Sequence, residues 1–131
     1  MQTFAELAAS RRDWIERVLR PWCAQAPLKE LRQAEQEWSD VAGRADTAAT
    51  LWTWAWGRFP ALVHLELPGV NETHEVRVML RDGSTLVGFP DNRQSVSGRL
   101  VLLCRREPGA RDFVESAPIL IDEIASVERL G

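Results

Sequence analysis

Three tryptophans, Trp52, Trp54 and Trp56, stand at alternate positions in one short segment of the chain. Aromatic rings gathered in this way can stack on a nucleobase or anchor a protein partner. On a helix Trp52 and Trp56 share one face, and Trp54 points nearly opposite. Aromatic stripes form core more often than binding platforms, so the spacing favours burial of Trp52 and Trp56. Trp54 is expected to be the most exposed and is a candidate partner-binding residue.

A second candidate site is an arginine-rich loop that runs from Arg105 to Asp112. It also holds Arg106 and Arg111, and guanidinium groups recognise phosphate or carboxylate through planar, charge-assisted hydrogen bonds. The alternative is a solvated hairpin loop in which Glu107 and Asp112 balance part of the positive charge. The sequence favours this alternative, but the loop is the one place where RNA or anion binding is expected if it occurs.

The sequence lacks the motifs of metal sites and of common enzyme active sites. Its cysteines and histidines include no closely spaced pair of the kind that structural zinc sites use. It has no G-x-S-x-G, no glycine-rich phosphate loop and no H-E-x-x-H. We therefore expect no enzyme activity, no metal and no cofactor, and we expect the two cysteines to be free, buried thiols. The residues considered for zinc are Cys23, His64, His74 and Cys104.

The charge balance argues against a general nucleic-acid binder. The 131 residues include 16 basic and 19 acidic side chains, a formal net charge of -3. Residues 1–66 hold 8 basic and 9 acidic side chains, and residues 67–131 hold 8 and 10, so neither half is a basic arm. No apolar run approaches the roughly 18 residues of a transmembrane helix, and a secretory signal pattern is absent. These features predict a cytoplasmic protein for which neither nucleic acid nor membrane is a partner.

The first half of the chain predicts a helical region over residues 1–66. Apolar residues follow a three-four rhythm over residues 4–22, which is typical of an amphipathic helix. Pro21 should kink or end that helix, because proline removes a backbone hydrogen bond and clashes with the preceding turn. Pro27 suits the first turn of a second helix, and a third is expected over about 48–58.

The second half, residues 72–130, predicts a small antiparallel sheet. Short runs rich in Val, Leu and Ile are bounded by turn residues, and Asp82-Gly83 is a strong tight-turn signal. The run 100–104 is apolar on both faces, so we expect it to be covered on both sides, with the helices on one of them. The expected strands cover residues 74–80, 85–89, 100–104, 119–122 and 126–130.

The order of these strands and turns resembles the small SH3-like barrels of the Sm/LSm type and the bacterial Rho-binding antiterminator. The resemblance covers about residues 74–130 and implies a closed five-stranded barrel. Sm-type RNA binding uses an Asp, an apolar residue and an Asn in a set spacing, whereas Asp91 and Asn92 are adjacent here. The RNA-contacting residues and Rho binding are therefore not carried over. The matching residues are Asp82-Gly83, Gly88, Gly98-Arg99-Leu100, Ile121 to Ile124 and Val127.

The prediction is an α+β protein in which a three-helix layer packs on a five-stranded antiparallel SH3-like barrel. Such a small barrel has only a marginal core of its own, so the two regions should unfold as one cooperative unit. We predict a bacterial, non-enzymatic protein-interaction or regulatory module with an unknown protein partner and scope for homo-oligomers. The alternatives are an Sm-like RNA-binding protein and a small-molecule or anion sensor. Exposed Trp54 favours the first, clustered arginines the second, and an enclosed polar cavity the third.

Overall fold

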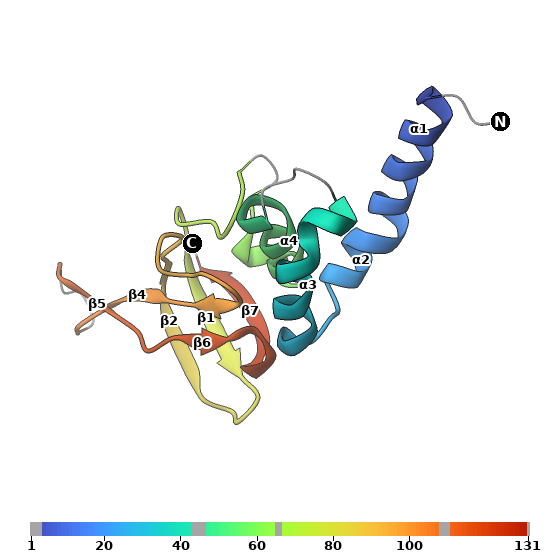
Figure 1. The fold of residues 1–131 in the computed structure, drawn as a ribbon. Helices are drawn as coiled ribbons and strands as arrows, with labels where there is room; N and C mark the ends of the chain where they lie inside the picture. Colours follow the sequence, from blue (N-terminus) through green and yellow to red (C-terminus); the bar gives the residue numbers. More distant parts are fainter. Residues whose placement is uncertain (1–3, 43–46, 65–66, 108–110, 131) are drawn as a thin grey trace.

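The computed structural model of the chain describes residues 4–42, 47–64, 67–107 and 111–130. Three N-terminal helices lie to one side of a C-terminal antiparallel sheet (Figure 1). The predicted α+β class is therefore confirmed. Within the described residues, no helix is both long and apolar enough to cross a membrane. The helical elements are α1 (Phe4–Trp14), the π-helical η1 (Ile15–Leu19), α2 (Arg20–Cys23), α3 (Leu28–Ala42), α4 (Thr47–Trp56) and the 3-10 turn η2 (Pro60–Leu62).

The first helix continues past Pro21, where the sequence predicted a kink or an end. The elements α1, η1 and α2 follow one another directly, and Pro21 lies in the first turn of α2. Just before the proline, the N–H of Arg20 donates to the carbonyl of Ile15, five residues earlier. This wider π-helical turn changes the hydrogen-bond partners before Pro21, which has no N–H to offer. The helix therefore ends only at Cys23.

Five strands form one antiparallel sheet in the order β5-β4-β2-β1-β7, and β3 and β6 form a separate two-stranded ribbon. The predicted five-stranded antiparallel sheet is thus confirmed. In its centre β1 pairs with β2, so that Val76 lies opposite Gly88 and Val78 opposite Leu86. The strands are β1 (Glu75–Leu80), β2 (Thr85–Pro90), β3 (Arg99–Leu100), β4 (Leu102–Arg105), β5 (Phe113–Glu115), β6 (Ile119–Leu120) and β7 (Ile124–Leu130), with the 3-10 turn η3 (Ile121–Glu123) before β7.

The sheet is open, so the prediction of a closed SH3-like barrel was wrong. Strand β5 pairs only with β4, and β7 pairs only with β1, which leaves them as the two edges among the described strands. The chain between them forms only the two-residue strand β6, which pairs with β3 and leads straight into η3. A strand this short does not join β5 to β7, so the ladder does not close.

The predicted third strand is split at Val101 into β3 and β4. The N–H of Val101 donates to the Ser95 hydroxyl at 2.9 Å, and its carbonyl accepts the N–H of Asp91. Both backbone groups are thereby satisfied outside a strand ladder, which lets the chain pass from the ribbon to the sheet. The predicted fourth strand shortens to β6. The fifth strand of the sheet is β5, in a segment for which no strand was predicted.

One hydrophobic core joins the helical layer to the sheet. It includes Leu31 of α3 together with Trp52 and Trp56 of α4, and it extends to the inner face of β1. Six residues from the strands and from η3 are almost fully buried, because each exposes at most 3% of its surface. These residues are Val76, Val78, Leu100, Leu102, Ile119 and Ile121.

Asp122 connects the sheet region to the helical layer. Both of its carboxylate oxygens accept the backbone N–H of Leu28, the first residue of α3, at 3.1 Å. The first amides of a helix lack partners within the helix, so this side chain satisfies one of them from η3. Its backbone carbonyl accepts a hydrogen bond from Arg81 at 2.8 Å. Asp122 therefore fixes the start of α3 against the turn that follows β1.

Candidate functional site

Trp54 lies on α4 and is the least buried of the three clustered tryptophans. Trp52 and Trp56 are 4% and 1% exposed, whereas Trp54 is half-buried and packs against the border of the core. The predicted order of exposure is confirmed. The indole N–H of Trp52 donates to the Glu35 carboxylate of α3, so its polar edge is satisfied within the helical layer.

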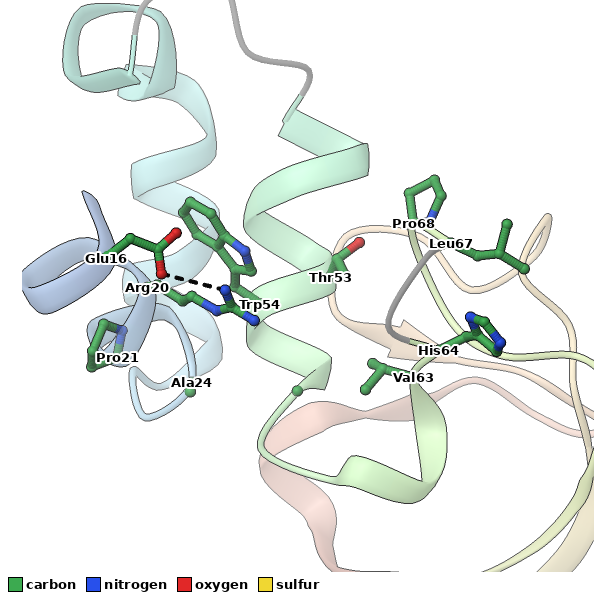
Figure 2. A pocket seen from close by; sticks show the side chains of 11 residues that line it. Glu16, Arg20, Pro21, Ala24, Thr53, Trp54, Val63, His64, Leu67 and Pro68 are labelled. Carbon is green, nitrogen blue, oxygen red and sulfur yellow. Dashed lines mark hydrogen bonds and ion pairs between the residues drawn. The ribbon is translucent and has the colours of Figure 1, made fainter. Parts of the chain in front are cut away.

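An open groove of about 730 Å³ runs beside Trp54. In Figure 2 the Trp54 ring extends from α4 toward Glu16 and Arg20 of the first helix, while His64 and Leu67 lie on the other side of α4. Glu16 and Arg20 form an exposed ion pair at 3.4 Å, so the charges of that wall balance each other. The groove is mixed in polarity and open, unlike the enclosed polar cavity expected for a small-molecule sensor.

The face of the sheet that points away from the core is a second candidate surface. Side chains alternate across a strand, so the neighbours of buried Val76 and Val78 point away from the helices. Several side chains on this face are apolar; Met79 is 44%, Val87 38% and Phe113 41% exposed. The strand registers place five of them on the same face. We call them the outer apolar patch: Met79, Val87, Phe89, Leu103 and Phe113.

Two phenylalanines and an arginine pack together at one end of the outer apolar patch. The rings of Phe89 and Phe113 meet edge to face, with their centroids 6.0 Å apart. The guanidinium carbon of Arg105 lies 5.1 Å from the centroid of the Phe113 ring, a cation–π contact. The Nε atom of Arg105 is 3.9 Å from the carboxylate of Glu75. Aromatic side chains and arginine are the residues that protein–protein interfaces enrich.

The predicted site residues do not gather into one site. Arg105 ends β4 on the outer face, whereas Trp54 belongs to the helical layer that covers the inner face. Arg106 forms an ion pair with Asp112 at 3.1 Å, and Arg111 is exposed. Residues 108–110 of this loop lie outside the described residues. Because Arg105 and Arg106 each lie beside a carboxylate, part of the positive charge that a phosphate needs is already balanced.

Both thiols are free, as predicted, and both have raised pKa values. Burial raises the pKa of Cys23 to about 11. For Cys104, which is only half-buried, burial and the nearby charge of Glu75 raise the pKa. A protonated thiol is a weak nucleophile and a weak metal ligand. In the described part of the chain, no three His, Cys, Asp or Glu side chains gather as a metal site.

No protein-family model, curated protein or solved structure matches this chain. The resemblance to Sm-type barrels stays a prediction, and the open sheet departs from the closed barrel that it implies. The outer apolar patch and the groove beside Trp54 are the two surfaces on which a function can be proposed.

Proposed function

We propose that this protein is a non-enzymatic protein-interaction module that binds its partner through the outer apolar patch. The observation that carries the proposal is the apolar centre of the solvent-facing side of the sheet. An antiparallel sheet with one covered face ordinarily presents polar side chains on the other. Here Met79, Val87 and Phe113 each expose about two-fifths of their surface on the face that the core does not reach. Contiguous exposed apolar surface of this kind marks interaction sites.

Two ion pairs lie among the charged side chains around the outer apolar patch. A guanidinium nitrogen of Arg77 lies 3.1 Å from a carboxylate oxygen of Glu128, and the guanidinium of Arg105 lies near the carboxylate of Glu75. Nucleic acid binds through clustered cations that neutralise phosphates, and paired arginines supply little of that charge. A polar rim around an apolar centre is the usual composition of a protein interface. The favoured partner is therefore a protein surface with its own apolar centre and charges of both signs.

Of the two alternative functions, one would use the groove beside Trp54 and the other would use part of the outer apolar patch. A small molecule would occupy the groove beside Trp54, whose volume lies in the range of ligand sites but which is open. RNA would stack its bases on Phe89 and Phe113 next to Arg105, as single strands do on aromatic side chains. Neither surface combines all the features that its ligand needs, so both rank below a protein partner.

Capture followed by reconstitution tests the proposal. The full chain serves as bait at low salt, with and without nuclease treatment, and the captured protein is then purified and titrated by calorimetry. We expect Val87→Glu to weaken binding at least about tenfold, because the new carboxylate is forced against an apolar surface. The matched control is Val18→Glu on the first helix, where Val18 is 52% exposed. It should leave the affinity unchanged.

Two results would contradict the proposal. One is a purified partner that binds Val87→Glu as tightly as the unchanged protein. The other is capture that depends on nucleic acid and disappears with nuclease, which favours the RNA alternative. Loss of binding in Val18→Glu alone moves the interface to the first helix and also counts against the outer apolar patch.

A further inference from the structure

The edge strand β5 carries a second, independent feature. It pairs with β4 on one side only, and no described strand covers its other side. Phe113 is 41% and Val114 43% exposed, and the β4–β5 hairpin points away from the helical layer (Figure 1). The opposite edge differs, because η2 packs beside β7. A free edge with apolar side chains is a template for another strand.

The hydrogen-bond phase of the β4–β5 ladder shows which backbone groups of β5 are available. Ser116 N–H donates to the carbonyl of Leu102, and Arg106 N–H donates to the carbonyl of Asp112. Bonded and non-bonded pairs alternate in an antiparallel ladder, so Val114 directs its backbone groups toward β4. Its two neighbours in β5 therefore direct their N–H and C=O groups toward the free edge.

We propose that a second copy of this chain docks on this edge, with the two β5 strands antiparallel about a twofold axis at Val114. In this register Phe113 lies opposite Glu115 of the second copy, and each Val114 lies opposite the other. The outward N–H and C=O groups of Phe113 then form hydrogen bonds with the C=O and N–H groups of Glu115 in the second copy. The two sheets join into one, and the two outer apolar patches lie on the same face.

Charge complementarity supports this register over a heterologous partner strand. Arg105 already lies on the Phe113 ring, on the outer face. The proposed pairing adds Glu115 of the second copy on the far side of the same ring. A cation, an aromatic ring and a carboxylate then follow one another across the interface. No ion pair of Glu115 is formed within the described residues. Twofold symmetry produces this arrangement twice.

The proposed interface is small, because β5 has only three residues. Stable interfaces bury about 800 Å² on each partner, so this dimer falls in the weak class. We expect a dissociation constant between roughly 1 μM and 1 mM. Sedimentation velocity of the full chain over that concentration range should show a reversible monomer–dimer equilibrium.

Substitution by proline at position 115 tests the backbone pairing. The N–H of Glu115 points to the free edge. Glu115→Pro therefore removes a hydrogen-bond donor from the dimer interface and leaves the hydrogen bonds between β4 and β5 intact. We expect it to weaken dimerisation at least about tenfold. Glu115→Gln keeps the donor and removes only the charge, and it should weaken dimerisation about two- to fivefold.

A cross-link tests the register without requiring the proline variant to fold. The two Val114 residues form a non-bonded pair, whose Cα atoms lie about 4.5 Å apart, within the range that a disulfide spans. Val114→Cys in a Cys104→Ala background should therefore give a disulfide-linked dimer on mild oxidation. Val87→Cys in the same background is the control, since Val87 is similarly exposed on the sheet face. It should cross-link much more slowly.

The proposal is overturned if the unchanged protein is monomeric at about 1 mM. A dimer that Glu115→Pro leaves intact, or a Val114→Cys variant that cross-links no faster than Val87→Cys, overturns it as well. These measurements use the purified chain alone. Their failure therefore leaves the binding of a different protein to the outer apolar patch untouched, and the two proposals fail separately.

Discussion

Burial of Cys23 links the stability of the protein to alkaline pH. The pKa of this thiol rises from its ordinary 9.0 to about 11 in the folded protein. Between these two values the unfolded chain loses the thiol proton while the folded protein keeps it. The unfolded state then binds fewer protons, so the free energy of unfolding falls as pH rises. The sequence has no tyrosine, and Cys104, whose pKa is raised as well, is the other thiol that contributes to this fall.

We expect the free energy of unfolding to fall between pH 9 and pH 11, and Cys23→Ala to remove most of that fall. Denaturant titrations across this range measure the slope for each protein. Cys104→Ala is the control, because it leaves the buried thiol of Cys23 in place and should retain most of the slope. An unchanged slope in Cys23→Ala would show that another group is responsible.

At the scale of elements, Gly98 lies where the ribbon meets the helical layer. Its φ of +81° is in the left-handed region, and a Cβ atom there would lie 2.3 Å from the Leu28 side chain. The same Cβ would lie 2.9 Å from the ring of Trp52. Backbone conformation and packing therefore both require glycine just before β3.

Gly83 has the left-handed backbone without the tight packing. Its φ is +91°, and nothing lies within 4 Å of a Cβ added there. Each glycine-to-alanine change should cost about 1–2 kcal/mol for the left-handed backbone. Gly98→Ala should cost about a further 1–3 kcal/mol for overpacking. Chemical denaturation of Gly83→Ala and Gly98→Ala gives the difference directly. Equal losses would mean that Leu28 and Trp52 move aside freely.

The elements that the sequence predicted correctly are those with a long periodic pattern. The alternation from Val76 to Leu80 and the turn at Asp82-Gly83 are local signals, and β1 and β2 follow them. Strand β5 was missed because three residues, beginning at Phe113, carry too little alternation to stand out. The break at Val101 depends on Ser95, a buried hydroxyl whose role is visible only once the fold is known.

The candidate site residues show the same contrast between local signals, which the sequence contains, and tertiary contacts, which it does not reveal. Trp54 was predicted from its position on one helix, which needs no tertiary information. The outer apolar patch needs the strand register, because Val87 and Phe113 share a face with Met79 only through the pairing of four strands. The predicted role of Arg105 in a loop was incomplete, because this residue ends β4 and its side chain lies over Phe113.

At the scale of the whole molecule, Trp56 tests whether the helical layer and the sheet unfold together. It is 1% exposed in the core that both share, so Trp56→Ala should cost about 3–5 kcal/mol. Thermal unfolding followed by circular dichroism should show helical and sheet signals lost in one transition. Trp14→Ala, at a residue 39% exposed on the first helix, is the matched control and should cost far less. Two separate transitions would show independent domains.

The net charge of -3 and the paired arginines predict no measurable binding to single-stranded RNA near physiological salt. Fluorescence anisotropy with a labelled oligonucleotide measures this directly. If binding appears at low salt, its binding constant should fall as salt is added. In the Arg105→Ala, Arg106→Ala double variant, the slope of log binding constant against log salt concentration should become shallower by up to about 2. Micromolar binding at physiological salt that this double variant abolishes would make the RNA alternative the leading function.

The first helix stands away from the sheet, and this has a consequence for its motions (Figure 1). Arg12 and Trp14 of this helix are exposed. The ion pair between Asp13 and Arg17 lies on its surface and adds little to the stability of the helix. Its amide protons should therefore exchange with deuterium through local fraying, within seconds to minutes, in a protein that stays folded. Amides of β1 should exchange only when the whole molecule opens. Deuterium uptake should thus divide the chain near Leu19, where the helix enters the core.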